Sequence, residues 1–419
     1  MNKEILNESL ELLKELIRYK TVNPPGNELA LAGFVCDLLK KNSINAKVLE
    51  SGPGRGNLVA RIKGEDSQKP IMMIAHTDVV DAVLSEWATN PFEPVERDGF
   101  LYGRGAIDNK GMLALEIVVM LLLVRNKVKL KRDVIFLSTC DEEKGGKLGM
   151  NWMINNHFSE IDAEYAINEG GRILIENGKY LFAGVQNLEK IPVNILLKVH
   201  SPGGHSSVPI NDNPVYHLSK AIMSIKNYKF PVKLNSITKE FFEGLGVDIY
   251  GDEVDKNPLF NAMLRDTVAP TIIKAGIAAN VIPSYGEVNL NCRLLPNTDF
   301  NEFISTLKRI IGDEKIELVY DEKDIKESVE SSIHSEMYKA IKDVLKEECR
   351  GITVLPFMST GATDSAKLRR KSVQVYGLLP FPISGDDLSR MHKSNERIKI
   401  ENFYKGLNIL WKIILRVAT

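Results

Sequence analysis

The chain has 419 residues, of which 44% are hydrophobic and 26% are charged, and its formal net charge is -1. This is the composition of a globular protein, and the length predicts two domains. The balanced charge offers no basis for binding nucleic acid or an anionic membrane. Four scattered cysteines (Cys36, Cys140, Cys292 and Cys349) form no CxxC pair, which favours unpaired thiols in a reducing compartment.

The N-terminal segment is amphipathic and acidic, and it lacks the basic start and unbroken apolar core of a signal peptide. The longest apolar run, residues 112–124, is interrupted by Glu116 and is too short to cross a bilayer. We therefore expect a cytoplasmic protein without a membrane partner.

Helical spacing of Leu, Ile and Val predicts helices over 3–17 and 28–41, joined by the turn sequence Thr21-Val-Asn-Pro-Pro-Gly26. Short apolar runs then alternate with helical stretches. The expected strands are 57–62, 71–75, 134–138 and 165–167, and the expected helices lie near 111–125 and 146–155. This alternation predicts an α/β sheet with helices on both faces, in which ligands gather at the carboxyl ends of strands.

The pattern changes near residue 188. A strand (193–199), a helix (214–225), a polar irregular stretch (226–265) and two strands (268–276 and 286–295) are expected next. From about 304 the alternation returns, with helices over 333–347 and 400–417 and a strand near 373–376. We infer a mixed-sheet α/β/α domain built from residues 1–187 and 304–419, interrupted by an inserted α+β domain over 188–303.

Polar clusters stand at the ends of the apolar runs, where they are costly unless they bind something. His76 and Asp78 lie two apart on an extended run, so they share a face, and the carboxylate can orient the imidazole of a metal ligand. Asp108 opens a helix after a Gly-rich turn, where it could be a metal bridge or an ordinary N-cap. The trio Asp141-Glu142-Glu143 is either buried against cations or a solvated acidic turn.

Two later residues complete this pattern. Glu169 follows another expected strand, and His392 lies in a polar loop before the last helix, where a histidine is commonly only solvated. Imidazole and carboxylate ligands for two metals, with one glutamate to spare, are what a two-metal hydrolase needs.

Several longer motifs contain these residues. They are Ala75-His-Thr-Asp78, Gly103-Arg-Gly-Ala-Ile-Asp108, Asp141-Glu-Glu143, Asn168-Glu-Gly-Gly171, Gly203-Gly-His205, Asn280-Val-Ile-Pro283, Gly361-Ala-Thr-Asp364 and His392. Through them, nearly the whole chain resembles peptidase family M20, the zinc exopeptidases and amidohydrolases that include aminoacylase, glutamate carboxypeptidase, acetylornithine deacetylase and succinyl-diaminopimelate desuccinylase. Arg293-Leu-Leu-Pro296 and Tyr376-Gly-Leu-Leu-Pro-Phe381 look closest to its carboxypeptidase S-like and N-acyl-amino-acid hydrolase branch.

The resemblance implies a role for each residue of the site. His76 and Glu169 would hold one Zn²⁺, Glu143 and His392 the other, and Asp108 would bridge the two and precede a cis peptide bond. Asp78 would orient His76. Glu142 would be the general base that moves a proton from a metal-bridging water to the leaving amine. Co²⁺ or Mn²⁺ would be possible substitutes for the two zinc ions of each subunit.

The resemblance further implies that the inserted domain forms a homodimer and sends His205 into the partner's active site, where it stabilises the oxyanion. Asn280 and Arg293 would contact substrate from this domain, and Gly361 and Thr363 from a loop of the catalytic domain. Arg293 suits a substrate carboxylate, although a surface ion pair is the alternative. Some members carry a second arginine in an Arg-x-Pro segment, and this chain has Glu327-Ser-Val-Glu-Ser-Ser332 there.

We therefore expect a dinuclear zinc hydrolase that cleaves the amide bond of small N-acyl amino acids or short peptides. One alternative is a dipeptidase or aminopeptidase-like specificity, in which Asp386-Asp387 binds a free substrate amine. Another is a metal-dependent binding protein without turnover.

Overall fold

The computed structural model describes residues 1–419, apart from the side chain of Asp324. Two compact units account for the chain. The first comprises Met1–Leu188, Glu330–Phe357 and Thr363–Thr419, and the second comprises Glu189–Val329 and Met358–Ala362. The second unit thus extends beyond the expected boundary at 303. The reason is that α9 (Phe300–Ile311) and β15 (Glu317–Val319) pack in its core and pair with its sheet.

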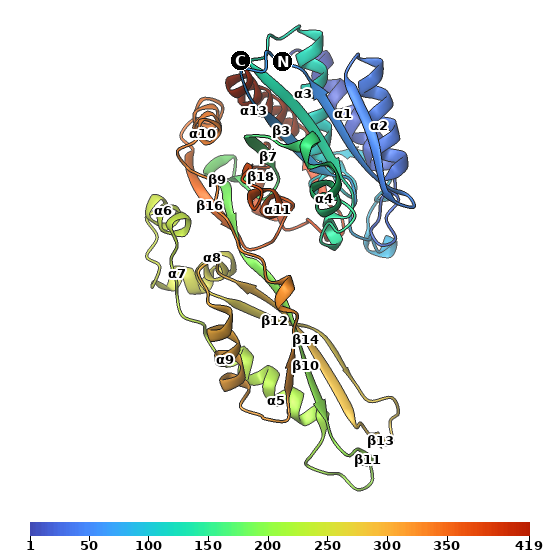
Figure 1. The fold of residues 1–419 in the computed structure, drawn as a ribbon, viewed down its shortest axis with the longest axis vertical. Helices are drawn as coiled ribbons and strands as arrows, with labels where there is room; N and C mark the ends of the chain where they lie inside the picture. Colours follow the sequence, from blue (N-terminus) through green and yellow to red (C-terminus); the bar gives the residue numbers. More distant parts are fainter. The chain divides into compact units, whose positions relative to one another are not determined.

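The main sheet of the first unit is mixed, and within the described residues it has the order β1-β2-β6-β3-β7-β17-β9-β8-β18, with β16 paired to β9. Figure 1 labels β3, β7, β9, β16 and β18 of this sheet. The strands are β1 (Asn45–Gly52), β2 (Arg55–Ile62), β3 (Gln68–His76), β6 (Arg132–Thr139), β7 (Tyr165–Asn168), β8 (Arg172–Glu176), β9 (Lys179–Glu189), β16 (Thr353–Ser359), β17 (Gln374–Gly377) and β18 (Pro382–Ser384). Strands β6, β3, β7 and β17 are parallel neighbours, whereas β1, β2 and β9 pair antiparallel. The expected mixed α/β fold is confirmed.

Helices cover both faces of this sheet. They are α1 (Lys3–Arg18), α2 (Leu29–Lys41), α3 (Lys110–Arg125), α4 (Met150–Ile161), α10 (Glu336–Glu348), α11 (Ser365–Arg369), α12 (Gly385–Leu388) and α13 (Ile400–Ala418). Successive residues of a strand point to opposite faces. Accordingly, Ile71 and Met73 of β3 join the core that contains α3 and α13, whereas Met72 and Ile74 join the core that contains α4. The apolar run 112–124 is therefore a buried core helix, and no helix of the described chain is long and apolar enough to span a bilayer.

A small antiparallel sheet, β19-β5-β4, completes the first unit. It consists of β4 (Val95–Arg97), β5 (Phe100–Tyr102) and β19 (Arg397–Lys399). Pairing of Tyr102 with Arg397 brings two segments together that are far apart in sequence. One leads into the Gly-rich turn before α3, and the other follows the loop of His392.

The second unit is built on the antiparallel sheet β12-β14-β10-β15, packed against α5 (Pro214–Asn227) and α9 (Figure 1). Its remaining strands are β10 (Ile191–His200), β12 (Thr267–Ala275), β14 (Tyr285–Leu294) and the short pair β11 (Gly204–His205) and β13 (Val281–Ile282). The expectation of an irregular stretch over 226–265 is wrong. This stretch contains α6 (Ser236–Leu245), α7 (Asp252–Lys256) and α8 (Pro258–Leu264), and the side chains of Asn235 and Asn257 cap α6 and α8.

Candidate metal centre

The parallel strands β6, β3 and β7 bring the polar clusters to one edge of the sheet. His76 ends β3 and lies opposite Thr139, the last residue of β6, and β7 pairs with the other side of β3. Glu142 and Glu143 follow β6 in a short 3-10 turn, η2 (Glu142–Lys144), and Glu169 directly follows β7. Because the carboxyl ends of parallel neighbours meet at one edge, these groups converge there.

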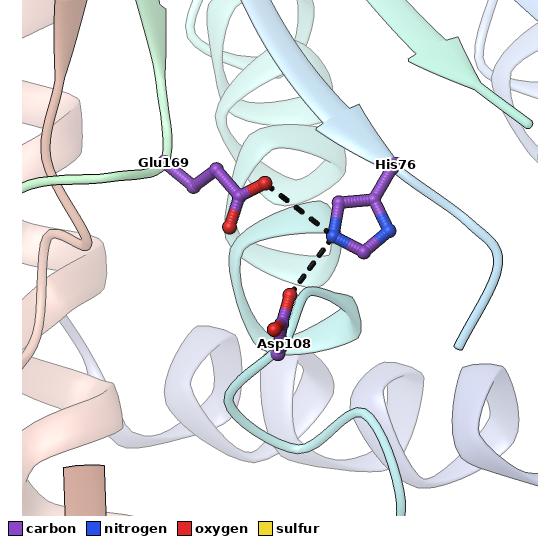
Figure 2. A group of neighbouring side chains, drawn as sticks. All are labelled: His76, Asp108 and Glu169. Carbon is purple, nitrogen blue, oxygen red and sulfur yellow. Dashed lines mark hydrogen bonds and ion pairs between the residues drawn. The ribbon is translucent and has the colours of Figure 1, made fainter. Parts of the chain in front are cut away.

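Asp108 lies between two imidazole rings. Its Oδ1 is 2.9 Å from Nε2 of His76, and its Oδ2 is 3.0 Å from Nε2 of His392. The Glu169 carboxylate lies 3.5 Å from the same His76 nitrogen (Figure 2), and Glu143 lies 3.3 Å from the His392 nitrogen. The peptide bond after Asp108 is cis, which confirms the expectation drawn from the resemblance.

These contacts define two ligand groups that share one carboxylate. His76, Asp108 and Glu169 form the first group, and Asp108, Glu143 and His392 form the second; in each, the ligand atoms lie within 4.8 Å of one another. Oxygen and imidazole nitrogen donors suit zinc and its neighbours in the transition series. Oε1 of Glu143 is buried without a hydrogen-bond partner in the described chain, so a donor atom remains available for a cation.

The electrostatics also fit a cation pair. Burial, and then the negative charge of Asp108, raise the pKa of Glu169 to about 8. Burial and the Glu169 charge likewise raise the pKa of Glu142 well above its usual range. Hydrogen bonds to Asp108 and Glu143 raise the pKa of His392 to about 10. The protein alone therefore holds protons among these acids, and bound dications would displace them.

Asp78 contacts more than the ring it is expected to orient. Nδ1 of His76 lies 2.9 Å from the backbone oxygen of Asp78 and 3.5 Å from its carboxylate. That carboxylate accepts hydrogen bonds from the backbone amides of Glu142 (3.0 Å) and Glu143 (3.1 Å). Asp78 thus fixes the turn that carries the expected base and a ligand of the second group.

The turn that carries Glu142 and Glu143 is also supported by residues for which the sequence predicted no role. Asn23 donates from Nδ2 to Asp78 (2.8 Å) and to Asp141 (3.1 Å). The buried Arg55 pairs with Glu28 and donates to Asp141 at 3.1 Å. In the sequence, Asn23 is only one residue of the turn predicted before α2, and its place in the site follows from the tertiary fold.

Residues expected to contact substrate lie mostly in the second unit. His205 and Asn280 are brought together by the β11–β13 pair, where the amide of Ser206 donates to the Asn280 carbonyl. Arg293 lies near the other end of β14, about 27 Å along the strand from Tyr285. Its Nε donates to Asn291 at 3.1 Å.

The loop of the Gly361-Ala-Thr-Asp364 motif divides between the two units. Gly361, in the second unit, donates its amide to Ser359, and Thr363, in the first, accepts the amide of Ser365 at the start of α11. The neighbouring Asp364 is buried and accepts a hydrogen bond from Thr139 at the end of β6.

The acids proposed to bind a free amine are already paired. Asp387 forms an ion pair with Arg397 at 2.7 Å and accepts a hydrogen bond from Ser384. Asp386 lies 3.1 Å from Arg390 and 3.3 Å from Arg397. Both carboxylates are therefore already paired with arginines in this structure.

The mixed sheet with its inserted unit and the shared-carboxylate ligand groups define a metallohydrolase of amide or peptide bonds with a dinuclear metal site. Residues 72–416 match the model of peptidase family M20/M25/M40, and the chain belongs to this family.

Similar proteins agree. The chain is 28% identical over 386 residues to human N-fatty-acyl-amino acid synthase/hydrolase PM20D1, covering 85% of this chain and 76% of the human protein. It is 27% identical over 387 residues to the probable carboxypeptidase S-like 2 of Dictyostelium discoideum, covering 85% and 74%. The crystal structure of the M20 family metallo-carboxypeptidase Sso-CP2 from Sulfolobus solfataricus shares the fold, with a TM-score of 0.76 and 20% identity over 99% of both chains. The expected carboxypeptidase S-like and N-acyl-amino-acid hydrolase branch is confirmed.

Proposed function

We propose that the chain is a zinc-dependent hydrolase of N-acyl amino acids or short peptides. The observation that carries this proposal is the position of Asp108, whose two oxygens each face the Nε2 of a different histidine. A carboxylate shared in this way matches a bridge between two metals. The ligand types match zinc best, with cobalt or manganese as substitutes.

When bound, the two cations would polarise the scissile carbonyl and lower the pKa of the attacking water. Glu142 is the residue we assign to proton transfer, because it belongs to neither ligand group and lies beside both. As a carboxylate outside both ligand groups, it can take a proton from the attacking water and return it to the leaving nitrogen. Asp78 holds it in place through its backbone amide.

The substrate class is supported from two sides. The human relative is named as acting on N-fatty-acyl amino acids, and the Dictyostelium relative as a carboxypeptidase. Both kinds of substrate end in a free carboxylate, for which Arg293 offers a guanidinium fork. The pairing of Asp386 and Asp387 with arginines disfavours an enzyme that recognises a free amine.

A panel of N-acyl amino acids and dipeptides, assayed with the metal content of the same sample, tests this function. We expect turnover of N-acyl amino acids or carboxy-terminal peptides, and a loss of about 100-fold or more in Glu142→Ala with both metals retained. Wild-type-like turnover in Glu142→Ala would show that the base is misassigned. A protein that binds two metals but hydrolyses nothing in the panel would be the non-catalytic alternative.

We also propose a homodimer formed through the second unit. Strand β12 is an edge strand with exposed Ile272 and Ile273, a surface that pairing with a second copy would cover. His205 and Arg293 lie at opposite ends of the unit, so in a dimer each could act at a different active site. Asn280 and Arg293 would contact substrate from the second unit, and Gly361 and Thr363 would contribute a binding loop.

Mixing two inactive variants tests whether His205 acts on the partner. A heterodimer of His205→Ala and Glu142→Ala has one active site with Glu142 from one chain and His205 from the other. We expect activity to reappear on mixing, up to about a quarter of the wild-type value if subunits exchange at random. No recovery in a sample shown to contain heterodimers would exclude action in trans, and a monomer by light scattering would exclude the dimer.

A cytoplasmic location is proposed from the four cysteines, all of which lie in the described chain, buried and without disulfides. Fractionation of the source cells would test it, and recovery of the native protein with oxidised, paired cysteines would contradict it.

A further inference from the structure

Glu396 lies four residues after His392 and is completely buried. Its carboxylate accepts four hydrogen bonds. Oε2 accepts from Nη1 of Arg104 at 2.8 Å and from the amide of Gly105 at 2.9 Å. Oε1 accepts from the amides of Ile107 at 2.7 Å and Asp108 at 3.1 Å. One side chain thus fixes the backbone of the turn that carries the shared ligand.

The backbone of the same segment holds that turn as well. The Glu396 carbonyl accepts the amide of Gly103 at 3.1 Å, and the next residue, Arg397, pairs with Tyr102 in the β5–β19 ladder. The turn from Gly103 to Asp108 is therefore fixed to the 392–397 segment at both of its ends. Asp108 and His392 take their relative position from this junction.

The charge of Glu396 is balanced within the same cluster. The guanidinium of Arg104 stacks over the Trp87 ring at 5.2 Å and donates from Nη2 to the Asp81 carbonyl at 3.1 Å. A buried carboxylate is stable where a paired cation and several donors satisfy its oxygens. Glu396 has both, so it remains a fixed anchor.

The loop of His392 is held from its outer side too. His392 and Asn395 have φ angles of 63° and 59°, which residues other than glycine rarely adopt. The loop therefore depends on contacts that hold it in this conformation. The Asn395 Oδ1 accepts the amide of Ala88 at 2.8 Å, and Ser394 donates to Glu86 at 2.9 Å. These contacts anchor the loop tip, whereas Glu396 connects it to Asp108.

We propose that Glu396 is a positioning residue that sets the second ligand group by fixing Asp108 and His392 relative to each other. This inference rests on the proposed two-metal function. Partners of metal ligands commonly change metal affinity by about 10–100-fold when removed. His392 belongs only to the second group, so the second metal loses more affinity than the first.

Glu396→Gln tests this with the least change of shape. Whichever way the amide is turned, its NH₂ group faces backbone N–H or guanidinium donors in place of an accepting oxygen. Asp133→Asn is the matched control, because Asp133 is a buried carboxylate on the same sheet that also accepts a backbone amide (Gly64, 2.9 Å) and an arginine (Arg61, 2.8 Å). It lies at the start of β6, away from the edge where the ligands converge.

Zn²⁺ binding to each metal-free protein is measured by calorimetry, and Co²⁺ absorption reports the coordination. We expect two ions to bind wild type and Asp133→Asn alike, whereas Glu396→Gln binds its weaker ion about 10–100-fold less tightly. The Co²⁺ band that Glu396→Gln loses should be the one that His392→Ala loses. Two unchanged affinities in Glu396→Gln, or an equal loss in Asp133→Asn, would overturn the inference.

Misfolding of Glu396→Gln and failure of wild type to bind two ions are two further results of this experiment. If Glu396→Gln does not fold by circular dichroism, Arg104→Lys takes its place, since it keeps the charge but loses the guanidinium fork to Glu396 and Asp81. Unchanged weaker-ion affinity in Arg104→Lys would then overturn the inference. If wild type itself fails to bind two ions, the proposed function falls, and the role of Glu396 falls with it. If wild type binds two ions and Glu396→Gln binds both with unchanged affinity, only the positioning role of Glu396 is refuted.

Discussion

Glu116 lies in the middle of α3, completely buried in the apolar core of the first unit. Neither of its oxygens has a hydrogen-bond partner of good geometry in the described chain. Burial raises the pKa of Glu116 well above its usual range, and the amide of Ile74 opposes this only weakly. The folded state therefore favours the protonated carboxyl group more strongly than the unfolded chain does.

This difference predicts a stability cost that grows with pH. Above the unfolded pKa of about 4.3, the folded state holds one more proton than the unfolded state, so stability falls by about 1.4 kcal/mol per pH unit until the folded pKa is reached. Burying a polar group without a hydrogen-bond partner costs about 1–3 kcal/mol in proteins. Methionine has a similar length without the carboxyl group, so we expect Glu116→Met to stabilise the first unit by about 1–3 kcal/mol at pH 7.

Thermal unfolding of wild type and Glu116→Met between pH 5 and pH 8 measures this effect. A gain of about 1–3 kcal/mol corresponds to a rise of about 2–6 °C in Tm, and the gap should widen with pH. The ligand carboxylates also titrate in this range, but they are common to both proteins and cancel in the difference. Glu4→Met, at an exposed position of α1, is the control and should show a flat difference. A Tm gap that is absent at pH 8, or that does not grow with pH, would refute the reasoning.

Three further outcomes are expected. Zn²⁺ at about 1,000 times its Kd should stabilise the metal-free protein by about 4 kcal/mol, and chelation or Asp108→Asn should abolish the rise in Tm; an equal rise in the variant would contradict the site. Burial raises the pKa of Cys140 and of Cys292 to about 12, so a thiol reagent at pH 8 should modify them only on unfolding, and labelling within seconds in the native protein would be inconsistent with that burial. Lys190→Met removes a cation whose burial lowers its pKa to about 7, but it leaves the carbonyls of Ala262 and Arg265 without their donor. We therefore expect faster amide exchange around Ala262 and Arg265, and unchanged exchange there would count against this.

Local patterns determined the elements that carry the ligands. Apolar runs over 71–75, 134–138 and 165–167 predicted the strands β3, β6 and β7, because a continuous apolar run bounded by polar residues is typical of a buried parallel strand. Ligands gather at the carboxyl ends of strands in an α/β sheet, so His76, the Glu142–Glu143 turn and Glu169 were expected at such ends, and the structure shows that their strands are parallel neighbours. The sequence predicted the second unit less accurately. Its polar residues over 226–265 indicated an irregular stretch where the structure has three helices, and the predicted boundary at 303 lies before the observed end at Val329.

The sequence by itself determined the kinds of ligand and the strand ends on which they stand, because these depend on short-range patterns. Only the tertiary structure decided which carboxylate faces both imidazoles, what the Asp78 carboxylate holds, and that Asp386 and Asp387 are neutralised. Glu396 shows the reason most clearly. Its bond to the Asp108 amide spans 288 residues of sequence, and no local pattern specifies a partner at that distance. Such contacts form only when the whole chain has folded around a common core.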